Sequence, residues 1–93
     1  MSTHHHYELA PDVVMQAAEG EALLVKLSAE DIFALNQTGA EIVGRLSAGE
    51  SLETLVTDLV QTYDAPADDV ARDVEALVAA LVARGLVRER TVP

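Results

Sequence analysis

The sequence predicts a small α+β domain of the winged helix-turn-helix type, in which a three-stranded antiparallel meander precedes three helices. Two observations carry this prediction. Short apolar runs separated by tight polar turns occupy residues 13–35, whereas the apolar spacing from Asn36 onward is helical. Ninety-three residues without a repeat or linker fit one compact domain.

Three segments read as strands. VVMQAA at residues 13–18 and ALLVKL at 22–27 flank Glu19-Gly20-Glu21, a turn in which glycine can adopt positive φ. Leu23, Val25 and Leu27 fall on one face of the second strand by the period of two. A polar turn at 28–31 leads to IFAL at 32–35, and tight turns between consecutive strands make the arrangement antiparallel.

Three helices are predicted from residue 36 onward. Asn36 or Thr38 can cap the first and Ser51 the second, while Pro66 opens the third. Gly49 and Gly85 end the first and third helices, and Leu86-Val87 should pack back as a tail. The expected apolar faces are Gly39, Ile42, Val43 and Leu46; then Leu52, Leu55, Val56, Leu59, Val60 and Tyr63; then Val70, Val74, Leu77 and Leu81, with Val78 and Val82 widening the last face.

Composition restricts the function. The net charge of −10 disfavours nucleic acid and anionic membranes, and the lack of cysteine excludes thiol catalysis and cysteine-ligated metals. No apolar run approaches the length of a membrane span, and no signal peptide is visible, so a cytoplasmic location is expected. We expect a flexible N-terminus at 1–10, a domain at 11–88 and a tail at 89–93. His4-His5-His6 is native or a remnant of a purification tag, and we predict neither a metal site nor a cofactor.

Two parts of the chain, from Leu35 to Ile42 and from Tyr63 to Val87, carry a recognisable motif pattern. This pattern resembles that of the PqqD-like family, which includes the pyrroloquinoline-quinone biosynthesis protein D and the RiPP recognition elements. The run Leu35-Asn36-Gln37-Thr38-Gly39-Ala40, followed by Ile42, looks like the LN-x-TGA-x-I motif of that family. Tyr63-Asp64, Asp73-Val74, Leu77, Leu81 and Gly85-Leu86-Val87 match its later pattern. The resemblance covers about residues 10–88.

The resemblance implies a binding protein rather than an enzyme. Members hold the leader segment of a ribosomally made precursor peptide as an added strand, between the third strand and the third helix, and present it to a modifying enzyme or leader peptidase. This chain lacks the tryptophan and the L-x-P-E turn of the pyrroloquinoline-quinone branch, having Leu27-Ser28-Ala29-Glu30 instead. It is therefore more similar to the stand-alone elements of lasso-peptide clusters, with pyrroloquinoline-quinone biosynthesis as the alternative.

The residues themselves indicate where such a peptide could bind. An edge strand offers unpaired backbone groups, and Phe33 and Leu35 are the better core candidates on it. One flank of the third helix has small residues that leave room for a leader side chain and aspartates that could meet a basic one. The opposite flank, with Ala71, Glu75, Val78 and Val82, is the alternative wall, and the small residues could instead serve only close packing. The predicted leader-binding residues are Asp31, Ile32, Phe33, Ala34, Leu35, Asp69, Asp73, Ala76, Leu77 and Ala80.

Two other functions are open. Glu50-Ser51-Leu52 resembles the attachment motif of an acyl carrier protein, but residues 13–35 read as strands and Ser51 is explained as a helix cap. A winged-helix DNA-binding protein would share the architecture, yet the third helix carries more aspartate and glutamate than arginine.

Overall fold

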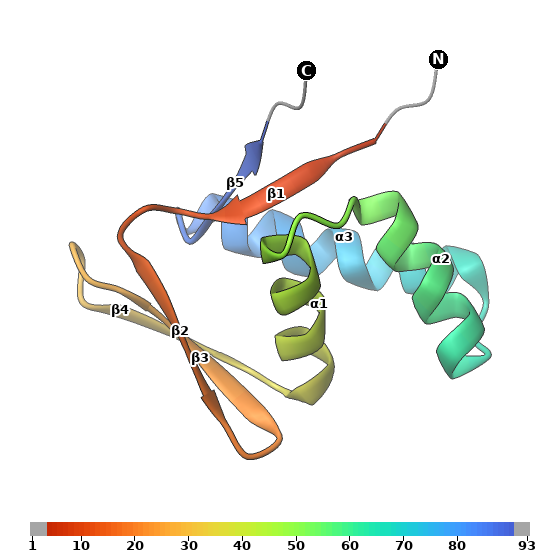
Figure 1. Ribbon diagram of the computed structural model, residues 1–93, viewed down its shortest axis with the longest axis horizontal. Helices are drawn as coiled ribbons and strands as arrows, with labels where there is room; N and C mark the ends of the chain where they lie inside the picture. The colour runs from red at the N-terminus through yellow and green to blue at the C-terminus, as the bar shows by residue number, and fades with distance from the viewer. Residues whose placement is uncertain (1–3, 91–93) are drawn as a thin grey trace.

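The computed structural model of the protein describes residues 4–90 and has five strands and three helices in that range (Figure 1). Residues 1–3 and 91–93 of the predicted N-terminus and tail lie outside the described residues. The elements follow in the order β1 (His6–Leu9), β2 (Val13–Ala18), β3 (Glu21–Lys26), β4 (Asp31–Leu35), α1 (Gln37–Ser47), α2 (Leu52–Tyr63), α3 (Ala67–Ala83) and β5 (Val87–Arg90). The predicted meander followed by three helices is confirmed.

The antiparallel meander has the order β2-β3-β4. Its inner face is defined by Ala22 and Leu24, which are 1% and 0% exposed. Leu23 and Val25 share a face as predicted, and this face points away from the core. Strand β3 ends at Lys26, so Leu27 lies in the following turn and is 63% exposed.

The helix boundaries follow the predicted capping residues. The Asn36 side chain accepts a hydrogen bond from the Gly39 N–H at 2.8 Å, and the Ser51 hydroxyl accepts one from the Thr54 N–H at 3.1 Å. Ser51 is only 6% exposed and also donates to Thr54 Oγ1. These bonds explain Ser51 as the cap of the second helix.

A second, two-stranded sheet is formed by the two ends of the chain. Strand β1 pairs with β5 in an antiparallel register that places Leu9 opposite Val87, and the two lie side by side in Figure 1. The structure here differs from the expected flexible N-terminus at 1–10 and tail at 89–93, since both segments contribute a strand. Packing of Tyr7 and Leu9 on the core, and an ion pair of 2.8 Å between Arg88 and Glu8, hold this sheet in place.

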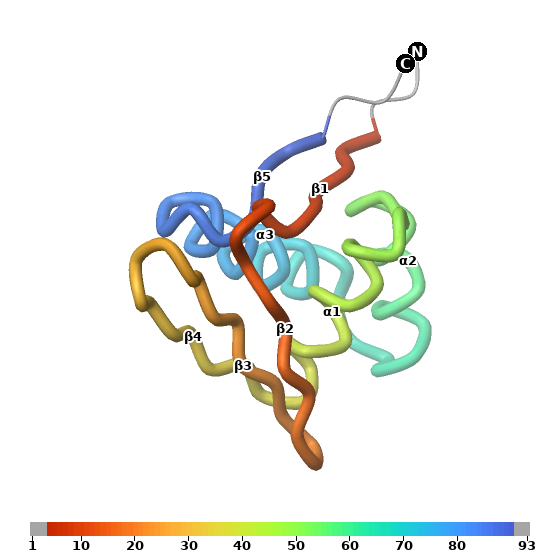
Figure 2. Tube along the Cα trace, turned by 60° about the vertical axis from the view of Figure 1, so that its left-hand side comes forward, coloured from red at the N-terminus to blue at the C-terminus, as the bar shows by residue number. Residues whose placement is uncertain are grey.

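Helix α3 lies between two hydrophobic clusters. One cluster joins the meander, α1 and the end of α3, and includes Leu24, Leu81 and Leu86. The other joins the three helices and includes Leu55, Val74 and Val78. Figure 2 shows the meander on one side of the helices and the β1–β5 pair at one end. The position of α3 therefore depends on both clusters.

The histidines near the N-terminus contact the start of α2. His5 hydrogen-bonds to Glu53 through its ring and its backbone N–H, both at 2.7 Å, and its carbonyl accepts from the Leu52 N–H. His4 and His6 lie near Ser51 and the Gly49 carbonyl. Across residues 4–90, no group of three or more His, Cys, Asp or Glu could hold a metal ion, and no helix is long and apolar enough to cross a membrane.

The attachment of β1 is expected to depend on pH. The hydrogen bond to Glu53 raises the pKa of His5 above its usual 6.5. Burial alone would raise the pKa of Glu53, but the His5 hydrogen bonds outweigh it and lower this pKa below 4.5. The His5–Glu53 contact therefore stabilises the fold most between pH 4.5 and pH 6.5, the usual pKa values of the two groups. The stabilisation is lost at higher pH as His5 deprotonates, and at lower pH as Glu53 becomes protonated.

An NMR titration of the His5 ring protons tests this contact. The midpoint should lie above pH 6.5 in the wild type and move back towards 6.5 in Glu53→Gln. His6, which contacts a backbone carbonyl rather than a carboxylate, serves as the internal control. Identical His5 midpoints in the two proteins would contradict the contact.

Candidate functional site

Strand β4 is an open edge of the meander. Within the described residues it pairs with β3 alone, in a register that sets Asp31 against Lys26, Phe33 against Leu24 and Leu35 against Ala22. One long side of β4 is thus available to another extended chain.

The ladder determines which backbone groups lie on this open side. The Leu27 N–H donates to the Asp12 carbonyl at 2.9 Å, so the odd-numbered residues of β3 direct their amides towards β2. The even-numbered residues of β3 consequently pair with Asp31, Phe33 and Leu35. Because antiparallel strands alternate in this way, Ile32 and Ala34 direct their N–H and C=O groups to the open edge.

A groove of about 520 Å³ runs beside β4, and we call it the β4–α3 groove. Its walls come from β4, the start of α1, the second half of α2 and the first half of α3. It is lined by Phe33, Ala34, Leu35, Asn36, Thr38, Gly39, Ile42, Leu59, Tyr63, Val70, Asp73, Val74 and Leu77. Most of these side chains are apolar, so the groove favours an apolar side chain over a charged one.

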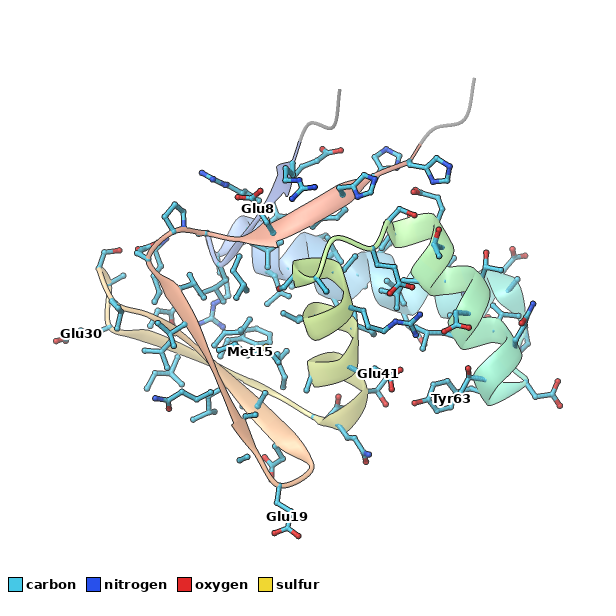
Figure 3. The ribbon with its side chains drawn as sticks, viewed as in Figure 1. Glu8, Met15, Glu19, Glu30, Glu41 and Tyr63 are labelled. Carbon is cyan, nitrogen blue, oxygen red and sulfur yellow. The ribbon has the colours of Figure 1, made fainter. Side chains whose placement is uncertain are left out.

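Polar groups line part of this groove. The Asn36 amide oxygen is committed to capping α1, as predicted, and a Cβ on Gly39 would lie 3.2 Å from that oxygen. Glycine at this position thus allows the cap to sit close to the helix. Asp73 is exposed, and Tyr63, at the far end of α2, is 52% exposed (Figure 3). These two groups can contact the polar parts of a bound peptide.

An arginine side chain lies over the ring of Phe33. The Arg84 guanidinium lies 4.9 Å from the centre of the Phe33 ring and pairs with Asp31 at 2.5 Å. This ion pair links β4 to the end of α3, and the cation–π contact restricts the ring that lines the groove. The role of Asp31 is thus a contact between β4 and α3.

Only some of the predicted leader-binding residues line the groove. Phe33, Ala34, Leu35, Asp73 and Leu77 line the β4–α3 groove. Ile32 is 59% exposed on the outer face of the meander, though its backbone lies at the open edge. The remaining helical residues are exposed and do not line the groove: Asp69, Ala76 and Ala80.

A rotation of α3 explains this division. The buried residues of α3 are Val74, Val78 and Leu81, whereas Val70 and Leu77 are only partly buried. The predicted stripe of Val70, Val74, Leu77 and Leu81 does pack on the core, and Val78, expected to widen that face, is more deeply buried than Val70 or Leu77. With Val78 inside, Leu77 and Val70 turn towards β4, and Ala76 turns away from it.

Sequence reasoning missed the contribution of the other helices to the groove. The sequence predicts Ile42 and Leu59 as core residues of their helices, and both are buried, yet they also line the groove. Apolar periodicity cannot separate these two roles. The sequence predicts Tyr63 as part of the apolar stripe of α2. Its position as an aromatic residue at the end of that stripe, next to a helix break, is the one feature of the sequence that indicates a place in the groove.

Comparison with solved structures finds the same fold in leader-peptide complexes. A chain described as "Lasso peptide synthetase B1 complexed with the leader peptide" is 28% identical, with a TM-score of 0.83 over 89% of this chain and 98% of the other. A second, described as "TbiB1 in Complex with the TbiA(beta) Leader Peptide", is 24% identical, with a TM-score of 0.83 over 91% and 99%. The second likeness establishes the fold alone.

Comparison with sequence families identifies the chain. No curated protein matches it. The model of the family described as "Coenzyme PQQ synthesis protein D (PqqD)" matches residues 21–87, from the start of β3 to the start of β5. This span includes β4, the three helices and every residue that lines the β4–α3 groove. The chain belongs to the PqqD family.

Proposed function

We propose that this chain is a non-catalytic protein that binds the leader segment of a ribosomally synthesised precursor peptide and presents it to a maturation enzyme or leader peptidase. One observation carries the proposal: the open edge of β4 lies directly beside an apolar groove. The similarity to a lasso peptide synthetase B1 chain complexed with its leader peptide favours a lasso-type precursor over the pyrroloquinoline-quinone type.

The leader adds to the meander as a strand antiparallel or parallel to β4. Ile32 and Ala34 provide the N–H donors and C=O acceptors for this pairing, independently of the leader sequence. Alternate leader side chains then point into the β4–α3 groove, where Leu35, Val70 and Leu77 surround an apolar or aromatic group. Selectivity comes from the groove and basal affinity from the backbone.

The charges on α3 support a peptide partner over DNA. Two arginines belong to this helix or its cap, and both are engaged: Arg72 pairs with Asp69 at 2.6 Å and Arg84 with Asp31 at 2.5 Å. Asp68, Asp73 and Glu75 are exposed on the same helix. A helix with this charge would repel the phosphates of a DNA groove.

Titration of a fluorescent leader peptide tests the function. The leader of a short precursor encoded beside this chain should bind with a dissociation constant in the micromolar range or below, whereas its core segment alone should not bind. Chemical shifts of the labelled protein should change along β4 and at Leu77. The absence of binding to any such leader, with the protein folded, would rule the proposal out.

Charge reversal at Asp73 should weaken leader binding. Asp73→Lys replaces the carboxylate beside the groove, and a leader with a basic residue nearby should bind about three- to tenfold more weakly, equal to ~1 kcal/mol. The matched control is Asp68→Lys, near the start of the same helix, exposed and outside the groove. Fluorescence titration of both variants gives the comparison, and equal losses would show that only the overall charge matters.

A further inference from the structure

The opposite flank of α3 lines a second and larger groove, of about 790 Å³. It is bounded by β1, the start of α2, β5 and the flank of α3 that runs from Ala71 to Ala83. Its apolar floor includes Tyr7, Leu52, Val56, Val78 and Val82. Val82 is 43% exposed, so part of this floor is open to solvent. We call it the acidic groove because of the carboxylates described next.

Three glutamates from three elements line the acidic groove: Glu53 of α2, Glu75 of α3 and Glu89 of β5. All three act on the same two residues of the groove. The pKa of His5 is raised first by its hydrogen bond to Glu53 and then by the charges of the three glutamates. The pKa of Tyr7 is raised first by burial and then by the same three charges. Negative potential is thus concentrated over an apolar floor.

Glu75 and Glu89 form no salt bridge within residues 4–90, whereas Glu53 is engaged by His5. The arginines in that range pair with other carboxylates: Arg45 with Glu50 and Asp58, Arg72 with Asp69, Arg84 with Asp31, and Arg88 and Arg90 with Glu8. Two exposed carboxylates beside an apolar floor complement a ligand that is both apolar and cationic.

We propose that the acidic groove binds a basic amphipathic segment of the enzyme that receives the precursor peptide. Apolar residues of that segment cover Val56, Val78 and Val82, and its Lys or Arg side chains pair with Glu75 and Glu89. A second copy of this chain does not suit the groove, because each copy carries a net charge of −10. The inference rests on the proposed function, since it concerns the partner to which the leader is presented.

The two grooves lie on opposite flanks of one helix. Asp73 and Leu77 face the β4–α3 groove, while Glu75, Ala79 and Val82 face the acidic groove. A leader and an enzyme segment can therefore be bound together without contact between them. This arrangement places the precursor next to the enzyme, and binding of one partner does not block the other.

A synthetic peptide of about 14 residues, or four helical turns, tests the groove directly. It carries leucine on one face and lysine along both borders, and a control peptide has glutamate in place of lysine. The basic peptide should shift the NMR signals of Ala71, Ala79 and Ala83 in the full chain, with the same affinity when the β4–α3 groove is saturated with leader. The acidic peptide should produce no shifts.

Matched variants separate a specific site from general attraction to an acidic protein. Glu75→Lys should weaken the basic peptide at least about fivefold. Glu19→Lys, the same charge change at the exposed β2–β3 turn, should have little effect (Figure 3). Ala79→Trp, which fills the groove without changing charge, should also weaken binding. The affinity of the purified enzyme of the pathway, measured with leader present, should fall in the same variants and stay unchanged in Glu19→Lys.

The leader titration on the same variants distinguishes failure of this inference from failure of the proposed function. Glu75→Lys and Ala79→Trp should bind the leader as the wild type does. Equal affinity of Glu75→Lys and Glu19→Lys for the basic peptide, or displacement of that peptide by the leader, would overturn the second site alone. Loss of leader binding in the wild type would instead overturn the proposed function.

Discussion

Replacing Ala34 with proline is expected to reduce the affinity for the leader peptide at least about tenfold, or ~1.4 kcal/mol, while the domain stays folded. Ala34 directs its N–H to the open edge of β4, so proline removes a donor that the meander itself does not use. The ring also occupies the space of the added strand. Proline is tolerated on edge strands at such positions, which limits the effect on stability.

Ala17→Pro is the matched control for this variant. Ala17 is an exposed alanine on β2, the other edge of the meander, and the same alternation directs its N–H away from β3. Ala17→Pro should bind the leader with the affinity of the wild type. Fluorescence titration, with circular dichroism to confirm folding, gives the comparison. If Ala34→Pro bound the leader normally, strand addition at β4 would have to be abandoned, and binding through the β4–α3 groove alone would remain.

The local features of the fold were predictable because each depends on neighbouring residues. Gly20 has a φ of 74°, as the predicted turn requires, and Asn36 and Ser51 cap their helices. In contrast, the β1–β5 pair joins opposite ends of the chain. HYEL alternates polar and apolar residues, but over only four positions, and VRER has a single apolar residue. Which strand each segment pairs with is set by tertiary contacts that these short patterns do not specify.

The candidate site was only partly predictable for a related reason. The edge strand followed from the order of strands in a meander, and Phe33 and Leu35 face inward as expected. The rotation of α3 did not follow, because alanine and valine occur around most of that helix and give little contrast between its faces. Burial of Val78 instead of Val70 decided which flank meets β4, and this depends on the packing of α2.

Leu81→Ala should cost about 2–5 kcal/mol of the free energy of unfolding, the largest stability loss among the variants considered. Leu81 is 1% exposed and packs α3 against the cluster of the meander, so truncation leaves a cavity between α3 and the sheet. A domain of this size has about 5–15 kcal/mol in total, so the variant should unfold at a much lower urea concentration. Val82→Ala, the adjacent and 43% exposed position, should change the free energy by less than about 0.5 kcal/mol.

Leader peptide should compensate for much of this loss, because it binds only the folded state. At a leader concentration about 100-fold above the dissociation constant, the gain is ~2.7 kcal/mol, comparable to the loss from Leu81→Ala. Urea unfolding of Leu81→Ala with and without leader measures this gain. In Ala34→Pro, the same leader concentration should raise the free energy of unfolding only slightly. A Leu81→Ala protein that loses less than about 1 kcal/mol would mean that α3 is not fixed against the meander. In that case, the width of the β4–α3 groove would not be set by the core.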